Sequence, residues 1–304
     1  MELCRRVKRE EAGRTLESFL RQVLGLSRHT LRHLKQTRAV TLNGRTAHYK
    51  TRLSEGDEVR AVLAAGQGGR CPPSAEPQPI PLDVVYEDPC LLVVNKPAGM
   101  LVHPVKRQPF GTLANAVIYH LQGSGAEPVF RPVTRLDRNT SGLAVIAKNA
   151  HIAFVLAGML HTKDFFREYL AVVHGHPVPG EGCIDLPVAP RQRGVVKQSV
   201  QAGGRRAVTH YRVEKYINGF SLVRVWLETG RTHQIRLHFC SIGCPVVGDE
   251  LYGGRPEGIS RQALHCWRVR LLHPTDGRVL DLTSPPPGDM AALLAKIGTA
   301  GRKY

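Results

Sequence analysis

The chain has few acidic residues for its length. It carries 25 Asp and Glu against 42 Lys and Arg over 304 residues, which gives a formal net charge of +17. An excess of this size favours a polyanionic partner, and nucleic acid is the default candidate. Charge alone leaves open a basic protein without such a partner.

Long apolar runs are missing as well. No stretch approaches the roughly 20 consecutive apolar residues that a transmembrane helix requires, so an acidic membrane surface is the weaker candidate. The start of the chain, Met1-Glu2-Leu3-Cys4-Arg5-Arg6, contains no apolar signal segment. We therefore expect a cytoplasmic protein that does not contact membranes.

The cysteines form neither a disulfide framework nor a familiar metal pattern. Seven of them are scattered along the chain, at positions 4, 71, 90, 183, 240, 244 and 266. An odd, dispersed set favours free thiols in a reducing compartment. Cys240 and Cys244, together with His238 and His265, could be considered as metal ligands. Their spacing in the sequence is not a common zinc pattern. We expect packed thiols and no metal.

Length and composition divide the chain into two units. A chain of 304 residues exceeds the usual size of one domain. The segment 66–81 contains three glycines and five prolines, too many for the interior of a helix or strand. We expect a small domain over 1–65, a linker over 66–81 and a larger domain over 82–304.

The first unit shows short amphipathic elements. A first helix is indicated by apolar residues at i, i+3, i+4 and i+7, namely Leu16, Phe19, Leu20 and Val23. A second helix is expected to start at Ser27 as its N-cap, and residues 40–45 predict a hairpin around an Asn43-Gly44 turn. The second helix carries a basic face, made of Arg28, Arg32, Lys35 and Arg38.

The second unit mixes strands and helices. Apolar runs predict strands at 84–88, 91–95, 143–147, 169–173 and 222–227, and helices near 112–122, 149–160 and 232–242. The last helix is expected to begin at Thr232 as N-cap and to end at Gly243. Its predicted buried stripe consists of Ile235, His238, Phe239 and Ile242. Such a mixture predicts an α+β fold.

Residues 134–142, T-R-L-D-R-N-T-S-G, place one carboxylate between two guanidinium groups. Positive charge from Arg135 and Arg138 favours the ionised form of Asp137. An ionised carboxylate in a basic environment can act as a nucleophile or a base. On these residues alone, a surface aspartate in a turn is the alternative.

Several segments, in the same order, resemble the RluA/RluD family of pseudouridine synthases. Residues 134–142 resemble its R-L-D-x-x-T-S-G signature, residues 95–104 its N-K-P-x-G-x-x-V-H-P loop, and residues 167–175 its K-x-Y-x-A-x-V-x-G strand. Residues 230–238 and 243–249 resemble its G-R-x-H-Q-I-R-x-H and G-x-P-I-x-G-D blocks. Three positions depart from the family pattern: Thr134 and Asn139 stand where many members have His and Asp, and Arg167 stands in place of Lys.

The resemblance implies a pseudouridine synthase fold with a mixed, largely antiparallel sheet. It implies Asp137 as the catalytic carboxylate, Arg236 as the cation that holds it, and Tyr169 as a ring against the uracil whose hydroxyl helps to remove the C5 proton. Arg135 is expected to fill the gap left by a flipped base or to hold a phosphate, and Leu237 to form an apolar wall. Thr140 and Ser141 are expected to bond to the backbone of their own loop.

The N-terminal unit resembles the S4 RNA-binding domain, a small α/β module. The resemblance implies that the basic face of its second helix lies against RNA phosphates, where neutralised charges release counterions. A solvated face of a packing module is the alternative.

The implied reaction converts uridine to pseudouridine within an RNA strand. It adds no group and changes no oxidation state, so we expect no cofactor, and the sequence contains no phosphate-binding P-loop. The implied partner is structured RNA, with large-subunit ribosomal RNA ahead of tRNA, and we expect a monomer. Two other functions stay open: a catalytically silent, ribosome-associated RNA-binding protein, and a base-excision glycosylase, which would release free uracil.

Overall fold

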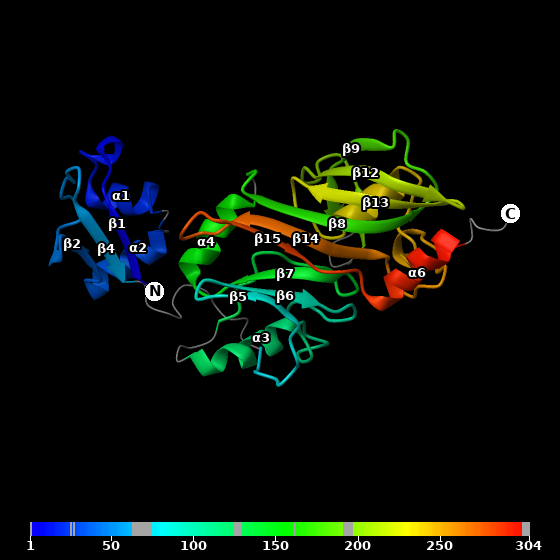
Figure 1. Ribbon diagram of the computed structural model, residues 1–304, viewed down its shortest axis with the longest axis horizontal. Helices are drawn as coiled ribbons and strands as arrows, with labels where there is room; N and C mark the ends of the chain where they lie inside the picture. Colours follow the sequence, from blue (N-terminus) through cyan, green and yellow to red (C-terminus); the bar gives the residue numbers. More distant parts are fainter. Residues whose placement is uncertain are drawn as a thin grey trace.

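The computed structural model describes residues 2–24, 26, 28–62, 75–124, 129–160, 162–190 and 197–299. Two separate sheets and a short ribbon organise them (Figure 1). A four-stranded sheet belongs to the N-terminal residues, and a nine-stranded sheet belongs to the residues from 84 onward. No helix among the described residues is both long enough and apolar enough to cross a membrane.

The N-terminal sheet is backed by two helices. Its elements are β1 (Glu2–Arg6), the 3-10 turn η1 (Arg9–Glu11), α1 (Leu16–Gln22), α2 (Arg28–Thr37), β2 (Val40–Leu42), β3 (Arg45–Thr46) and β4 (Glu58–Val62). The predicted apolar faces are buried, because Leu16, Phe19, Leu20, Leu31 and Leu34 belong to one core cluster. The hairpin turn is also confirmed: Asn43 and Gly44 both have positive φ, 51° and 77°, as a two-residue type I′ turn requires. Ser27, the expected N-cap of α2, lies outside the described residues.

The large sheet runs in the order β5-β6-β7-β14-β8-β13-β12-β9, and β15 pairs with β14. Its strands are β5 (Val84–Glu87), β6 (Leu91–Lys96), β7 (Ser141–Ala147), β8 (Phe165–His174), β9 (Glu181–Asp185), β12 (Val208–Ile217), β13 (Phe220–Leu227), β14 (Leu264–Leu272) and β15 (Val279–Thr283). The β7–β14 pair is parallel and the other pairs are antiparallel. A two-stranded ribbon, β10 (Val188–Pro190) with β11 (Gln198–Val200), stands apart from it. The expected mixed, largely antiparallel α+β fold is therefore confirmed.

Helices cover both faces of this sheet. They are α3 (Leu113–Leu121), α4 (Ala150–Met159), α5 (Gln234–Ser241) and α6 (Gly288–Thr299), with short 3-10 turns η2 (Gln122–Ser124) and η3 (Glu250–Tyr252). Side chains of β6 alternate between the two faces: Leu91 and Val93 join the main core with α4, α5 and α6, whereas Leu92 and Val94 pack with α3. Figure 1 shows α3 lying below β5 and β6.

The start of α5 differs from the sequence expectation. The N-cap is His233, with a left-handed φ of 56°, and not Thr232. The Gln234 side chain holds this turn, because its Oε1 accepts hydrogen bonds from the Arg231 backbone N and from Thr229 Oγ1 at 3.0 and 2.9 Å. The predicted stripe is also wrong at Ile242, which is 38 % exposed. Gly243 follows the helix with φ 76°, which matches the expected helix end.

The last residues of the Gly/Pro-rich segment are attached to the large unit. Asn115 Nδ2 donates to the Glu76 carbonyl at 2.7 Å, and the Gly111 backbone N donates to Gln78 Oε1 at 2.7 Å. Leu82 packs on the same cluster as α3. Residues 75–81 therefore carry more contacts than a linker was expected to carry, and residues 63–74 lie outside the described residues.

Candidate active site

Asp137 lies in the loop that leads into β7. The loop closes into a turn through a hydrogen bond from the Thr140 backbone N to the Asp137 carbonyl at 3.1 Å. Gly142 then brings β7 against β14: its φ is 112°, and a Cβ at this position would lie 2.2 Å from the Cys266 carbonyl oxygen. Only glycine permits this approach, so the end of the T-R-L-D-R-N-T-S-G segment is held by strand pairing.

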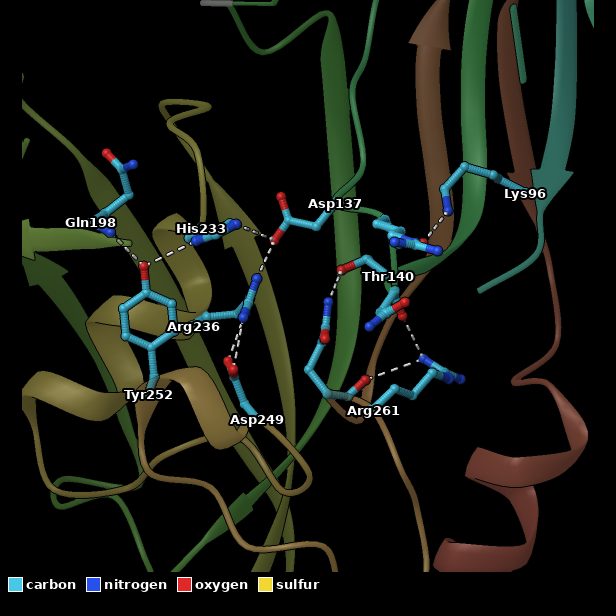
Figure 2. Close-up of polar contacts among 12 residues, drawn as sticks. Lys96, Asp137, Thr140, Gln198, His233, Arg236, Asp249, Tyr252 and Arg261 are labelled. Carbon is cyan, nitrogen blue, oxygen red and sulfur yellow. Dashed lines mark hydrogen bonds and ion pairs between the residues drawn. The ribbon is translucent and has the colours of Figure 1, made fainter. Parts of the chain in front are cut away.

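Arg236 joins Asp137 to a second, deeply buried carboxylate (Figure 2). Its Nη1 donates to Asp137 Oδ2 at 3.1 Å, while its Nε and Nη2 donate to the two oxygens of Asp249 at 2.6 and 2.7 Å. The side chains of Arg236 and Asp249 are 8 % and 1 % exposed. Burial would lower the pKa of Arg236, but hydrogen bonds and charges from Asp249 and then Asp137 outweigh it and raise that pKa.

The two arginines next to Asp137 in sequence do not pair with it. Arg138 Nε donates instead to the Gly99 carbonyl at 3.1 Å, and Arg135 is exposed. Among the described residues, the ion pairs of Asp137 are those with Arg236 and His233. The prediction that Arg135 and Arg138 supply the positive charge beside Asp137 is therefore wrong. The Arg236–Asp137 pair that the family resemblance implied is present.

His233 is the second cation candidate beside Asp137. Its Nε2 lies 3.9 Å from Asp137 Oδ2, and its Nδ1 lies 3.0 Å from the Tyr252 hydroxyl, which accepts a hydrogen bond from the Gln198 backbone N at 2.8 Å. Burial lowers the pKa of His233, against an opposite effect of the Asp137 charge, so the imidazole is mainly neutral at neutral pH. Sequence analysis did not single out His233, Asp249 or Tyr252. The available signal was the carboxylate that ends the G-x-P-x-x-G-D block.

Three side chains hold the Asp137 loop from outside, two through its backbone and one through the Thr140 hydroxyl (Figure 2). Lys96, which is fully buried, donates from Nζ to the carbonyls of Pro97, Met100 and Arg138 at 2.8, 2.9 and 3.1 Å. Burial lowers the pKa of Lys96 to about 7, and the Asp137 charge opposes that shift. The other two supports are Arg261, which donates to the Asn139 carbonyl at 3.0 Å, and Gln262, which donates to Thr140 Oγ1 at 3.2 Å.

The hydroxyls after Asp137 make different bonds from those expected. Thr140 accepts from the Gln262 side chain, and Ser141 Oγ lies 2.9 Å from His265 Nδ1. Both partners come from the segment at the start of β14, more than a hundred residues away in sequence. The two side chains therefore fasten the loop to β14 and do not brace its own backbone.

Tyr169 and Leu237 are both buried, but in different places. Tyr169, on β8, is 5 % exposed and pairs across the sheet with Cys266 and Val225. Burial raises the pKa of its hydroxyl, which disfavours the phenolate that a base would need. Leu237 packs in a small cluster with Val188, Ala207 and Tyr252.

The basic face expected on α2 is only partly free. Lys35 Nζ pairs with Glu17 at 3.1 Å and lies over the Tyr49 ring, 4.9 Å from its centroid. Arg32 and Arg38 are exposed. Arg28 begins α2, and its side chain lies outside the described part of the chain.

The residues considered as metal ligands are separately engaged. His238 Nε2 lies 3.0 Å from the Leu186 carbonyl, and His265 lies between Ser141 and the Ser284 carbonyl. In the described residues the arrangement closest to a ligand set is a different one, Asp88, Cys90 and His273. Asp88 there already accepts hydrogen bonds from two backbone amides and from Tyr86, with the Arg278 guanidinium 3.5 Å away, so a second cation has little reason to bind.

Comparisons with known proteins agree on one family. Residues 90–241 match the family model described as RNA pseudouridylate synthase, and residues 5–59 match the RluD ribosomal pseudouridine synthase N-terminal domain. The chain is 36 % identical to a protein named ribosomal large subunit pseudouridine synthase D from Xanthomonas campestris, over 94 % of this chain and 89 % of that protein. It is also 36 % identical to the protein of the same name from Nitrosomonas europaea, over 94 % of this chain and 85 % of that protein. A solved human structure, RNA pseudouridylate synthase domain containing 1, is similar with a TM-score of 0.55 and 27 % identity, over 68 % of this chain and 84 % of that chain.

Proposed function

The chain belongs to the RluD family of RNA pseudouridine synthases, and from this premise we propose that it modifies large-subunit ribosomal RNA with Asp137 as its catalytic carboxylate. The family membership makes it an isomerase that converts uridine to pseudouridine within RNA. Relatives named for the large ribosomal subunit align over 94 % of the chain, including its N-terminal unit, and support the choice of substrate. A tRNA substrate is the alternative.

The observation that carries the proposed role of Asp137 is its contact with the buried Arg236–Asp249 pair. The Arg236 guanidinium donates two hydrogen bonds to Asp249, and its remaining Nη1 donates to Asp137 Oδ2 at 3.1 Å. The Asp137 side chain is 24 % exposed, so it can reach a substrate from this fixed position. Attack at C1′, attack at C6 and removal of the 2′ proton all start from the same ionised carboxylate.

The other substrate contacts follow the family resemblance. Tyr169 offers a ring to the uracil, with its hydroxyl kept protonated by burial. Arg135 is exposed beside the Asp137 loop, where it can take the place of the flipped base or hold a phosphate. Leu237 contributes an apolar wall from the cluster around Tyr252.

The test of the catalytic role is Asp137→Asn in the full chain. Release of tritium from RNA labelled at uracil C5 should fall below about a hundredth of wild type, while RNA affinity changes little, since the substitution removes the reactive carboxylate and little of the basic surface. Asp185→Asn is the matched control, because Asp185 is 55 % exposed and pairs only loosely with Arg206, at 3.7 Å. Substantial conversion by Asp137→Asn would remove the assigned role.

The substrate is tested by mapping pseudouridine in total RNA from cells with and without the gene. The proposal expects one or more sites to disappear from large-subunit ribosomal RNA. If pseudouridine is lost only from tRNA, the substrate is tRNA and not ribosomal RNA. Free uracil released from RNA by the purified protein would point instead to a glycosylase.

A further inference from the structure

Arg167 is a buried arginine whose guanidinium has no polar partner within the described residues. It lies on β8, with 8 % of its surface exposed, and its Nε is buried without a hydrogen bond. Its recorded contact is with the Phe165 ring, whose centroid is 6.0 Å away. Two other arginines near the Asp137 loop differ in this respect. Arg236 donates two hydrogen bonds to Asp249, and Arg261 donates two to Asp289.

An unpaired buried charge is unfavourable. A buried Nε–H loses its hydrogen bonds to water, and this loss is offset only when an acceptor takes the place of water. The neighbouring Glu168 does not serve, since its carboxylate lies near Arg224 and Arg268, at 3.5 and 3.9 Å. Since no described residue supplies the acceptor that Arg167 lacks, we expect a bound molecule to supply it.

The position of Arg167 indicates which molecule supplies that acceptor. Arg167 and Tyr169 are two residues apart on β8, so their side chains leave the same face of the strand, about 7 Å apart at Cα. A Cβ at Gly230 would lie 3.5 Å from Arg167 Nη1, and Gly230 opens the short turn that ends at His233, beside Asp137. Arg167 thus borders the space in which Tyr169 and Asp137 are proposed to hold the target nucleotide.

The electrostatics agree with this placement. Both charges influence the pKa of the Tyr169 hydroxyl. Burial has the largest effect and raises this pKa, the charge of Arg167 lowers it, and the charge of Asp137 raises it. A group that enters between Arg167 and Asp137 therefore meets a cation on one side and a carboxylate on the other.

We propose that Arg167 is a further catalytic residue, which hydrogen-bonds a carbonyl oxygen of the target uracil and stabilises the negative charge that the ring acquires when its glycosidic bond breaks. This inference rests on the proposed function. When the C1′–N1 bond breaks, its electron pair stays with the uracil and spreads onto the ring carbonyl oxygens. The C1′–C5 bond that forms later uses an electron pair of the ring. The C5 proton then leaves to a base and N1 takes up one proton, so the product has the same atoms and charge as uridine. Arg167 transfers no proton, because arginine stays protonated in proteins; its action is electrostatic.

The planar guanidinium suits this task. It offers several N–H donors in one plane, so it can follow a carbonyl oxygen while the detached uracil turns about. A lysine at this position keeps the charge but concentrates it in one ammonium group. Arg167→Lys should therefore retain part of the function, and Arg167→Gln should lose the charge while keeping a donor.

The experiment compares full-length Arg167→Gln and Arg167→Lys with wild type in single-turnover conversion of an RNA substrate. Removing a preorganised charge from a developing anion costs on the order of 100-fold or more in rate. We expect that loss for Arg167→Gln, a smaller one for Arg167→Lys, and less than about a threefold change in the Kd for RNA. Arg224→Gln is the control, because Arg224 lies on the adjacent strand, is 42 % exposed and pairs with Glu214.

Two further measurements separate this role from a structural one. RNA containing 5-fluorouridine carries a base that leaves more easily, so the rate of its rearrangement should suffer at least tenfold less from Arg167→Gln than the rate with uridine. The Tm of Arg167→Gln should stay equal or rise, because the variant no longer buries an unpaired charge.

The inference is wrong if Arg167→Gln slows both substrates equally, or if it raises KM without changing the rate of the chemical step. The second result, with a flatter salt dependence, would assign Arg167 to a backbone phosphate. If Arg167→Gln does not fold, the rates of Arg167→Lys with uridine and with 5-fluorouridine are compared in its place. Failure here is distinct from failure of the proposed function, because Asp137→Asn would still abolish conversion of both substrates.

Discussion

At the scale of single residues, the site depends on how buried charges are matched. Arg236 serves two carboxylates, and the shorter pair of contacts goes to Asp249, which is almost inaccessible. Asp249 therefore determines where the Arg236 guanidinium lies, and Arg236 in turn determines where Asp137 lies. We therefore infer that Asp249 is a positioning residue, because its side chain, 1 % exposed, is almost closed to solvent.

Asp249→Asn should weaken both stability and activity. The substitution leaves the buried Arg236 with one carboxylate in place of two, and breaking a buried pair typically costs about 3–5 kcal/mol. We expect a loss toward the lower end of that range in urea unfolding, together with at least a tenfold slower single turnover. Glu228→Gln is the control, because the exposed Arg206–Glu228 pair, at 3.4 Å, should contribute less than about 1 kcal/mol. Equal effects of the two substitutions would contradict this account.

At the scale of secondary structure, the site is built where β7 and β14 run parallel. Their short pairing joins Ser141 to His265 and Gly142 to Cys266, and Cys266 in turn faces Tyr169 on β8. This row of strands places the end of the Asp137 loop next to Tyr169. The close approach at Gly142 is therefore a requirement of the site and of the sheet.

Gly142→Ala should disrupt this junction. The new Cβ would lie 2.2 Å from the Cys266 carbonyl oxygen at a φ of 112°, so the two strands must separate. We expect a marked loss of Tm and of conversion. Gly158→Ala is the matched control: Gly158 lies inside α4 with nothing within 4 Å of its Cβ position, and alanine favours helices by up to about 1 kcal/mol. A Gly142→Ala variant with wild-type Tm would show that the strands can relax.

Acid should destabilise the protein partly through α4. Burial lowers the pKa of His151 to about 4, from the ordinary value of about 6.5 for histidine. The unfolded chain therefore takes up this proton at a higher pH than the folded chain does. Between about pH 6.5 and 4 the unfolded state binds more protons, and folding stability falls as pH falls; below about 4 this contribution stays constant. The difference in unfolding free energy between His151→Leu and wild type should therefore shift in favour of the variant as the pH falls from about 6.5 to about 4. Parallel curves for the two proteins would contradict the prediction.

At the scale of the whole molecule, the N-terminal unit carries exposed positive charge of its own. It has its own sheet and its own core cluster, and Arg32 on α2 and Arg38 just after that helix are exposed. The large unit begins earlier than sequence reasoning suggested, because Glu76 and Gln78 are bonded to residues around the start of α3. The two-domain division remains a proposal, and it can be tested by truncation.

A protein truncated to begin at Ala75 should fold and convert a short stem-loop nearly as well as the full chain. Its affinity for long ribosomal RNA should fall, and the dependence of log K on log salt should become shallower, because fewer phosphates are neutralised. The double variant Arg32→Gln, Arg38→Gln in the full chain is the companion measurement and should lower the slope by up to about 2. Equal slopes for all three proteins would mean that the N-terminal unit is no RNA anchor.

Local patterns in the sequence were sufficient for most of the secondary-structure elements and for choosing Asp137 as the candidate reactive residue. The Asn43-Gly44 turn, the apolar spacing in α1 and α2 and the strand runs of the large sheet depend on interactions between near neighbours, which a sequence displays directly. Asp137 was recognisable because it stands in a segment of unusual composition that resembles a family signature. Local patterns were insufficient at His233, since the left-handed start of α5 is imposed by the Gln234 side chain and not by a cap residue.

Tertiary structure decided how the cation beside Asp137 is held and which basic neighbours in sequence do not pair with it. Its cation comes from Arg236, 99 residues away, and not from the adjacent Arg135 or Arg138; the Asp249 contact that orients this cation is equally invisible in a linear motif. The unpaired state of Arg167 has the same origin, because burial and the absence of an acceptor among the described residues are properties of packed strands. Basic residues close in sequence to a carboxyl group indicate that the group can be ionised. The energy of a charge pair depends on the distance between the charges and on their burial. The folded structure sets both.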